Sequence, residues 1–120
     1  MGMEIYAQKN DESIFIAGSL DDTVKSMMSD WSVSKAKKTK EQTKKFIDSC
    51  TEVLHEEISL VLIDIMSVSG MIPTTIESVS EKKASILDGI ETIKGLTMTL
   101  KGLSVLIDLI DDDFKMVVSQ

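Results

Sequence analysis

The most chemically suggestive spacing in the chain is Glu52 followed three residues later by His55, a Glu-x-x-His pair on a predicted helix. This spacing lets a carboxylate and an imidazole bind one metal ion, but di-iron sites in helical bundles use the motif twice, together with further glutamates. Because His55 is the only histidine, a second copy of the motif does not exist. We therefore predict no metal and no cofactor, and we interpret His55 as a surface side chain.

The other reactive groups also lack the partners that catalysis needs. Cys50 is the only cysteine, and it precedes His55 by five residues, which is about 140° around a helix, so the two side chains do not share a face. Asp108 and the run Asp111 to Asp113 are not followed by the central glycine and closing glutamate of a calcium-binding EF-hand loop. The chain also has no phosphate-binding glycine loop and no nucleotide fingerprint. The sequence predicts a protein without enzymatic activity.

Composition narrows the class of partner. The net charge is −7 and every basic residue is lysine, so the chain lacks both the positive surface and the arginine forks typical of nucleic-acid binding. We expect no nucleic-acid partner. The apolar content of 42% is typical of a folded chain rather than a disordered one. A single cysteine fits a reducing compartment, and Met1 to Ala7 does not resemble a secretory signal. The expected location is cytoplasmic, with leaderless secretion left open.

The first 18 residues differ from the rest of the chain. Glu4 to Tyr6 and Ser13 to Ala17 are short β-prone runs on either side of a polar segment, a pattern typical of a hairpin or an extended arm. We assign residues 1–18 to such an N-terminal arm and residues 19–120 to a helical domain.

A helix is predicted from about Leu20, because Ser19 offers a side-chain cap and Asp21 and Asp22 place negative charge in the first turn. The lysine-rich segment 32–45 fits either a solvated helix or a loop between helices. Since it holds good helix formers and no Gly or Pro, we favour a continuous helix.

The clearest periodicity in the chain begins at Ile47. Residues that recur in alternating steps of four and three predict one buried helix face, made of Ile47, Thr51, Leu54, Ile58, Val61, Ile65, Val68 and Ile72. Gly70 and Pro73 interrupt the pattern, which places the main turn of the chain near residues 69–74.

A second long helix is predicted from Thr74 or Thr75 to about Val118. Its buried face is marked first by Ile86, Ile90 and Ile93 and, after a shift in phase, by Leu96, Leu100, Leu103, Ile107, Ile110, Phe114 and Val117. The predicted fold is all-α: an antiparallel helical hairpin or a small helical bundle, with a short N-terminal extended arm or hairpin.

Folding on the main turn predicts a register in which residue i faces about residue 144 minus i. In that register Trp31 lies beside Phe114, and Leu54 lies beside Ile90. The lysines of segment 35–40 then lie near the aspartates Asp108, Asp111, Asp112 and Asp113.

Two features predict a partner-binding surface. Gly95 and Gly102 are one heptad apart with Thr99 between them, so they form a narrow groove of small residues that lets another helix approach closely. In addition, several apolar residues lie off the two main faces, where a two-helix hairpin does not bury them. The predicted partner-binding residues are Leu60, Ile63, Gly95, Met98, Thr99, Gly102, Val105 and Leu109.

These features together favour a non-enzymatic protein–protein interaction module: an adaptor, a chaperone-like protein or a secretion-targeting partner that buries an apolar helical face against another protein or against itself. In length and in having a central turn the chain is similar to small helical hairpins of the type VII secretion family, although its turn has no Trp-x-Gly and no residue is assigned from that family. The alternative is a membrane-active helical protein that uses the apolar 58–72 segment and the turn.

Overall fold

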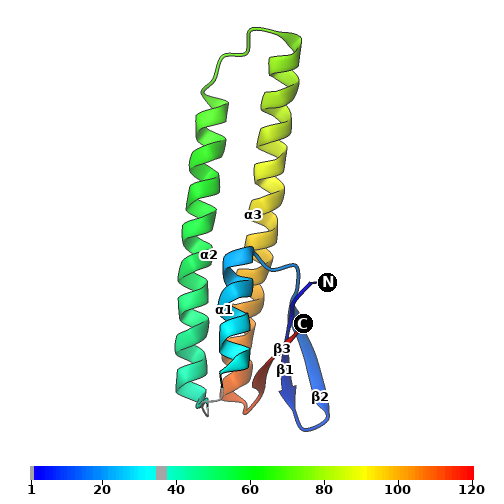
Figure 1. Ribbon diagram of the computed structural model, residues 1–120, viewed down its shortest axis with the longest axis vertical. Helices are drawn as coiled ribbons and strands as arrows, with labels where there is room; N and C mark the ends of the chain where they lie inside the picture. Colours follow the sequence, from blue (N-terminus) through cyan, green and yellow to red (C-terminus); the bar gives the residue numbers. More distant parts are fainter. Residues whose placement is uncertain (1, 35–37) are drawn as a thin grey trace.

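The computed structural model describes residues 2–34 and 38–120 as two long helices, a short helix and a small sheet (Figure 1). In chain order the elements are β1 (Glu4–Lys9), β2 (Glu12–Ala17), α1 (Asp22–Val33), α2 (Lys40–Ser69), α3 (Ile76–Asp111) and β3 (Lys115–Ser119). The molecule is elongated, with principal extents of 59 × 23 × 23 Å. The sheet and α1 lie beside the lower halves of α2 and α3, and the upper halves of these two helices project beyond them.

The all-α prediction is wrong, because the three strands form an antiparallel sheet in the order β2-β1-β3. The two β-prone runs near the N-terminus form the β1–β2 hairpin, with Asn10 in the left-handed conformation at its turn (φ 53°). This hairpin is not an arm separate from the helices. Its inner side chains, Ile5, Ala7 and Ala17, are buried in the common core with residues of α1, α2 and α3.

The third strand replaces the predicted end of the second long helix. The helix ends at Asp111, the chain reverses at Asp113 (φ 71°), and β3 pairs with β1. Phe114 and Val117 were expected on the helix, but Phe114 precedes the strand and Val117 lies within it. Adjacent aspartates favour a helix end, and the following apolar residues have the alternating burial of a strand, with Met116 buried and Val117 exposed.

The predicted continuity across segment 32–45 is also wrong, because α1 ends at Val33 and α2 begins at Lys40. The Thr39 side chain accepts a hydrogen bond from the backbone N–H of Gln42 (3.1 Å), and the Gln42 side chain accepts one from the N–H of Thr39 (3.0 Å). This reciprocal capping box starts a new helix, and it outweighs the good helix propensity of the segment. Residues 35–37 of the predicted basic block lie outside the described residues.

The helical hairpin is antiparallel, but its register differs from the predicted one. Gly89 lies against Ile65, and Lys40 pairs with Asp113 at 3.4 Å, so residue i faces about residue 154 minus i rather than 144 minus i. The predicted neighbour of Leu54, Ile90, therefore lies about ten residues away along the hairpin.

An extended connection causes the register shift. The chain from Gly70 to Thr75 does not make a tight turn but runs along the first turns of α3 (Figure 1). Lys82 Nζ donates a hydrogen bond to the Met71 carbonyl oxygen (2.9 Å) and holds this connection against α3. As a result, α3 begins well beyond the end of α2.

Candidate interaction surface

The molecule divides into a base with a core and an arm without one. We call residues 55–95 the arm and the other described residues the base. Every buried residue lies in the base, including Ile5, Val24, Met28, Ile47, Cys50, Leu54, Leu103, Leu106 and Ile110. The arm instead holds ten of the exposed large apolar side chains: Leu60, Leu62, Ile63, Met66, Met71, Ile72, Ile76, Val79, Leu87 and Ile90.

The two helices of the arm meet closely at a glycine. A Cβ added at Gly89 of α3 would lie 2.7 Å from Ile65 Cγ1 and 3.6 Å from Val61 Cγ1 of α2, so the glycine is what allows this close approach. Ile86 and Ile93 lie within about 60° of Gly89 around α3 and are part-buried, so they belong to the same contact with α2.

Some of the exposed apolar residues of the arm lie on one side of the hairpin. On α3, Ile90 follows Gly89 by one position, and on α2 Leu62 and Met66 follow Val61 and Ile65 by one position. One position turns a helix by about 100°. Because the two helices are antiparallel, this rotation takes these residues to the same side. We call this surface the apolar face, and it consists of the exposed residues Leu62, Met66, Val79 and Ile90.

The opposite side of the arm is acidic. Asp64 and Asp88 precede the contact residues Ile65 and Gly89 by one position, and both are exposed. In the base this same side is covered: Trp31 of α1 stacks on Phe46 (ring centroids 5.7 Å apart), and Ile16 of β2 approaches α3. The apolar face therefore lies on the side of the hairpin that neither α1 nor the sheet covers.

The predicted partner-binding residues fall into two groups. Leu60, Ile63, Met98 and Val105 are exposed, and nothing lies within 4 Å of a Cβ added at Gly95. None of these five belongs to the apolar face, since they point toward the acidic side or directly away from the neighbouring helix.

The other three predicted residues lie inside the base. Thr99 is buried and its hydroxyl donates to the Gly95 carbonyl oxygen (3.1 Å), while Leu109 packs against the core. A Cβ added at Gly102 would lie 2.6 Å from the Ile16 carbonyl oxygen. The groove at Gly102 thus does receive a close neighbour, but this neighbour is β2 of the same chain.

Comparison of the chain with known protein families, with curated proteins and with solved structures gave no match. The assignment of a function consequently depends on the geometry of the molecule alone.

Sequence reasoning placed Ile86, Ile90 and Ile93 on the inner face of the second long helix. Ile86 and Ile93 are part-buried there, whereas Ile90 is 42% exposed and the inner position beside it is taken by Gly89.

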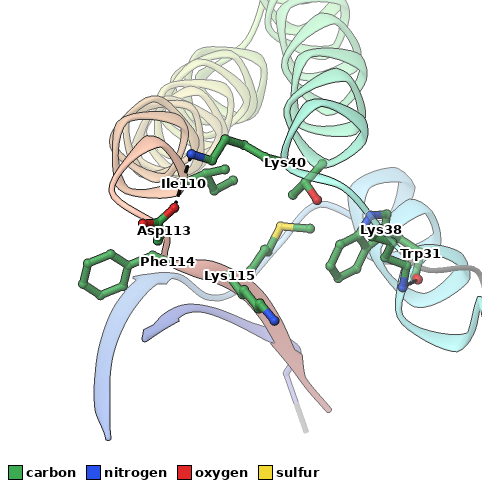
Figure 2. A pocket seen from close by; sticks show the side chains of 9 residues that line it. Trp31, Lys38, Lys40, Ile110, Asp113, Phe114 and Lys115 are labelled. Carbon is green, nitrogen blue, oxygen red and sulfur yellow. Dashed lines mark hydrogen bonds and ion pairs between the residues drawn. The ribbon is translucent and has the colours of Figure 1, made fainter. Parts of the chain in front are cut away.

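A pocket of about 400 Å³ lies in the base between α1, the start of α2 and the end of α3 (Figure 2). Trp31 and Phe114 both line it, which agrees in part with their predicted proximity. The Lys38 ammonium lies 3.9 Å from the Trp31 ring centroid, and Lys40 pairs with Asp113. Protein groups thus already engage the ammonium ions of Lys38 and Lys40, whereas Lys115, which also lines the pocket, takes part in no ion pair among the described residues.

The candidate reactive residues do not come together. Cys50 is buried, and burial raises the pKa of its thiol to about 11, so little thiolate exists at neutral pH. His55 is exposed on another side of α2. Across residues 2–34 and 38–120, no three His, Cys, Asp or Glu side chains are grouped as metal ligands.

Proposed function

We propose that this chain is a protein–protein interaction module that binds a protein partner through the apolar face of its arm. The proposal assigns the chain no catalytic step. The observation that carries it is the absence of any buried residue between positions 55 and 95, in two helices that nevertheless keep a regular apolar periodicity.

Energetics supports a covered arm. Ile90 is 42% exposed and Met66 is 73% exposed, and burying one such side chain fully contributes about 1.5 to 3 kcal/mol. Soluble proteins rarely expose a continuous apolar surface of this kind unless it serves an interaction. The net charge of −7 keeps the free chain soluble.

The test combines the mass of the purified protein with a dye that fluoresces on apolar surfaces. We expect either a stable assembly or a monomer that binds the dye. In both cases Ile90→Lys should diminish the assembly or the dye signal, because it places a charge in the apolar face. Leu60→Lys is the matched control, since Leu60 is 57% exposed but lies off this face. A monomer that binds no dye would contradict the proposal.

A second candidate function is supported by the tip of the arm. The segment 65–76 contains no charged residue, and Ile72 and Ile76 are 88% and 87% exposed. Such a tip suits insertion into the apolar edge of a bilayer. None of the described helices is long and apolar enough to span a membrane.

Liposome co-sedimentation separates the two functions. A membrane-active tip predicts that the protein pellets with vesicles and that Ile72→Asp releases it. A protein-binding arm predicts that the wild-type chain stays in the supernatant.

A further inference from the structure

We infer that the pocket between α1, α2, α3 and β3 binds a small amphipathic carboxylate, a molecule with one carboxylate group on a short apolar body. The pocket lies in the base and shares no residue with the apolar face, so this inference goes beyond the proposed function. Three features of the pocket support it: its volume, its apolar walls and its lysines.

The pocket forms where two breaks between elements meet. α1 ends at Val33 and α2 begins at Lys40, while α3 ends at Asp111 and β3 begins at Lys115. The space left between these four elements has a volume of about 400 Å³. This volume lies at the small end of the roughly 300 to 1,000 Å³ that is typical of small-molecule sites. It therefore suits a ligand whose apolar body is one aromatic ring or a short acyl chain.

The walls of the pocket are largely apolar and are already in place. Ile110 and Met116 are buried, and Trp31 and Phe114 are part-buried beside them. Phe46 stacks on the Trp31 ring with the ring centroids 5.7 Å apart, which restricts the orientation of the indole. Walls that are ordered before a ligand arrives reduce the entropy lost on binding. These side chains are therefore suited to contact the apolar body.

The charged groups of the pocket favour an anion. Its lining contains three lysines and one aspartate, namely Lys38, Lys40, Lys115 and Asp113. Of the two aspartates that precede Asp113, Asp111 pairs with Lys44, and Asp112 is exposed and outside the lining. The pocket thus concentrates positive charge in a chain whose net charge is −7.

A carboxylate fits these groups better than a phosphate. The chain has no arginine, so it lacks the planar fork that makes bidentate contacts with phosphate oxygens. Asp113 also lies in the lining, and its negative charge opposes a dianion more strongly than it opposes a single negative charge.

Lys115 has the ammonium group that is most available to the ligand. It takes part in no ion pair among the described residues. Lys40 reaches Asp113 Oδ1 and the Asp111 carbonyl oxygen at 3.4 and 3.3 Å, which are long hydrogen bonds. Lys38 is held against Trp31, where its ammonium also donates to the backbone carbonyl oxygen. Figure 2 shows these lysines reaching the pocket from different parts of the chain. We therefore assign the ligand carboxylate to Lys115, with Lys40 as the second cation.

Tryptophan fluorescence tests the inference directly, because Trp31 is the only tryptophan and lines the pocket. Titration with hydrocinnamate, a phenyl ring on a short carboxylate chain, should give a saturable change in this fluorescence. The neutral amide of hydrocinnamate has the same apolar body and should bind several-fold more weakly. The cation phenylpropylamine should bind more weakly still. Absence of a saturable change with hydrocinnamate would overturn the inference, and so would equal affinity for the acid and its amide.

A pair of lysine variants tests the assigned cation. Lys115→Gln should weaken hydrocinnamate binding about two- to fivefold, the size expected from losing an exposed ion pair. Lys101→Gln is the matched control, since Lys101 is exposed on α3 and lies outside the pocket lining. Circular dichroism should show both variants folded, because both lysines are exposed. An affinity that Lys115→Gln leaves unchanged, or that both variants reduce equally, would overturn the assignment.

Amide resonances in solution locate the bound ligand. Those of Ile110, Phe114 and Met116 should shift on addition of hydrocinnamate, whereas those of Leu62 and Ile90 should not. Shifts in the arm without shifts around the pocket would overturn the inference. The outcome is independent of the proposed function, because a chain whose arm binds no dye and no partner still has the pocket in its base.

Discussion

The base and the arm are built from the same two helices, yet only the base has a core. In the base, Leu54 and Leu103 are fully buried in one core that also contains residues of α1 and the sheet. In the arm, Ile65 faces Gly89, and the apolar face is bare. A regular apolar periodicity therefore indicates which face of a helix is apolar. It does not indicate whether residues of the same chain bury that face.

The burial of α3 expresses this difference. Its part-buried residues in the arm, Ile86, Gly89 and Ile93, continue the four-three spacing of Leu96, Leu100 and Leu103, so α3 keeps one face toward α2. Residues of this helix become fully buried only from Leu96 onward, where α1 and the sheet also contribute to the core.

The largest effect is expected from truncating the core of the base. Leu54→Ala should lower the free energy of unfolding by about 2 to 5 kcal/mol, because the side chain is fully buried and its loss leaves a cavity. Leu60→Ala on the same helix should cost less than about 0.5 kcal/mol. Urea melts in the Ile90→Lys background compare the two without a contribution from assembly. Equal losses would mean that the arm has a core of its own.

The buried thiol of the base should make stability depend on pH. The pKa of Cys50 is raised from 9.0 to about 11 in the folded chain, so the folded state retains the proton at pH values where the unfolded state loses it. Its contribution is fully present below pH 9 and is lost as the pH rises toward 11, by up to about 1 to 3 kcal/mol. Cys50→Ala should flatten this part of the pH profile. A profile unchanged by the substitution would place the thiol in contact with water.

Two glycines one heptad apart should respond with opposite signs. Gly102→Ala should destabilise the chain by about 1 to 3 kcal/mol, because the new Cβ meets the Ile16 carbonyl oxygen at 2.6 Å. Gly95→Ala should stabilise it by up to about 1 kcal/mol, since the position is open and alanine is the better helix former. Thermal melts of the pair check this, and losses of equal size would place a neighbour at Gly95.

The smallest effect is expected at the helix caps. Thr39→Ala removes the capping box of α2 in the base and should lower global stability by about 1 kcal/mol. Thr75→Ala removes the cap of α3 at the tip of the arm, where the Thr75 side chain accepts from the Ser78 N–H (3.0 Å). We expect this loss to appear as faster amide exchange near the tip rather than as a change in global stability. A global loss equal to that of Thr39→Ala would show that arm and base unfold as one unit.

Much of the helical part was predictable from local pattern. The breakers Gly70 and Pro73 and the residues Thr74 and Thr75 place the end of α2 and the start of α3 almost where the structure has them. Two of the wrong predictions could have been avoided from the local sequence. Thr39 and Gln42 match a capping box, which indicates a helix start, and the residues of β3 alternate as in a strand. In segment 32–45 the prediction gave too much weight to helix propensity. At the end of the second long helix it extended the helical periodicity too far.

The candidate site was less predictable. Composition and spacing indicated that the chain has more apolar residues than a helical hairpin buries. They did not indicate on which surface these additional apolar residues lie. Leu62, Met66 and Ile90 come together on one face only through the way α2 and α3 pack, which depends on how far the connection from Gly70 to Thr75 runs along α3.

The sequence by itself determined the local order of the chain: where its long helices lie, that they fold back on each other, and that more apolar surface exists than two helices bury. Only the tertiary structure decided that β3 pairs with β1, that β2 rather than another protein fills the groove at Gly102, and which side of the arm is bare. The reason is physical. Periodicity and capping act over a few neighbouring residues, whereas strand pairing across more than a hundred residues and the register of two helices depend on contacts between segments that local sequence does not specify.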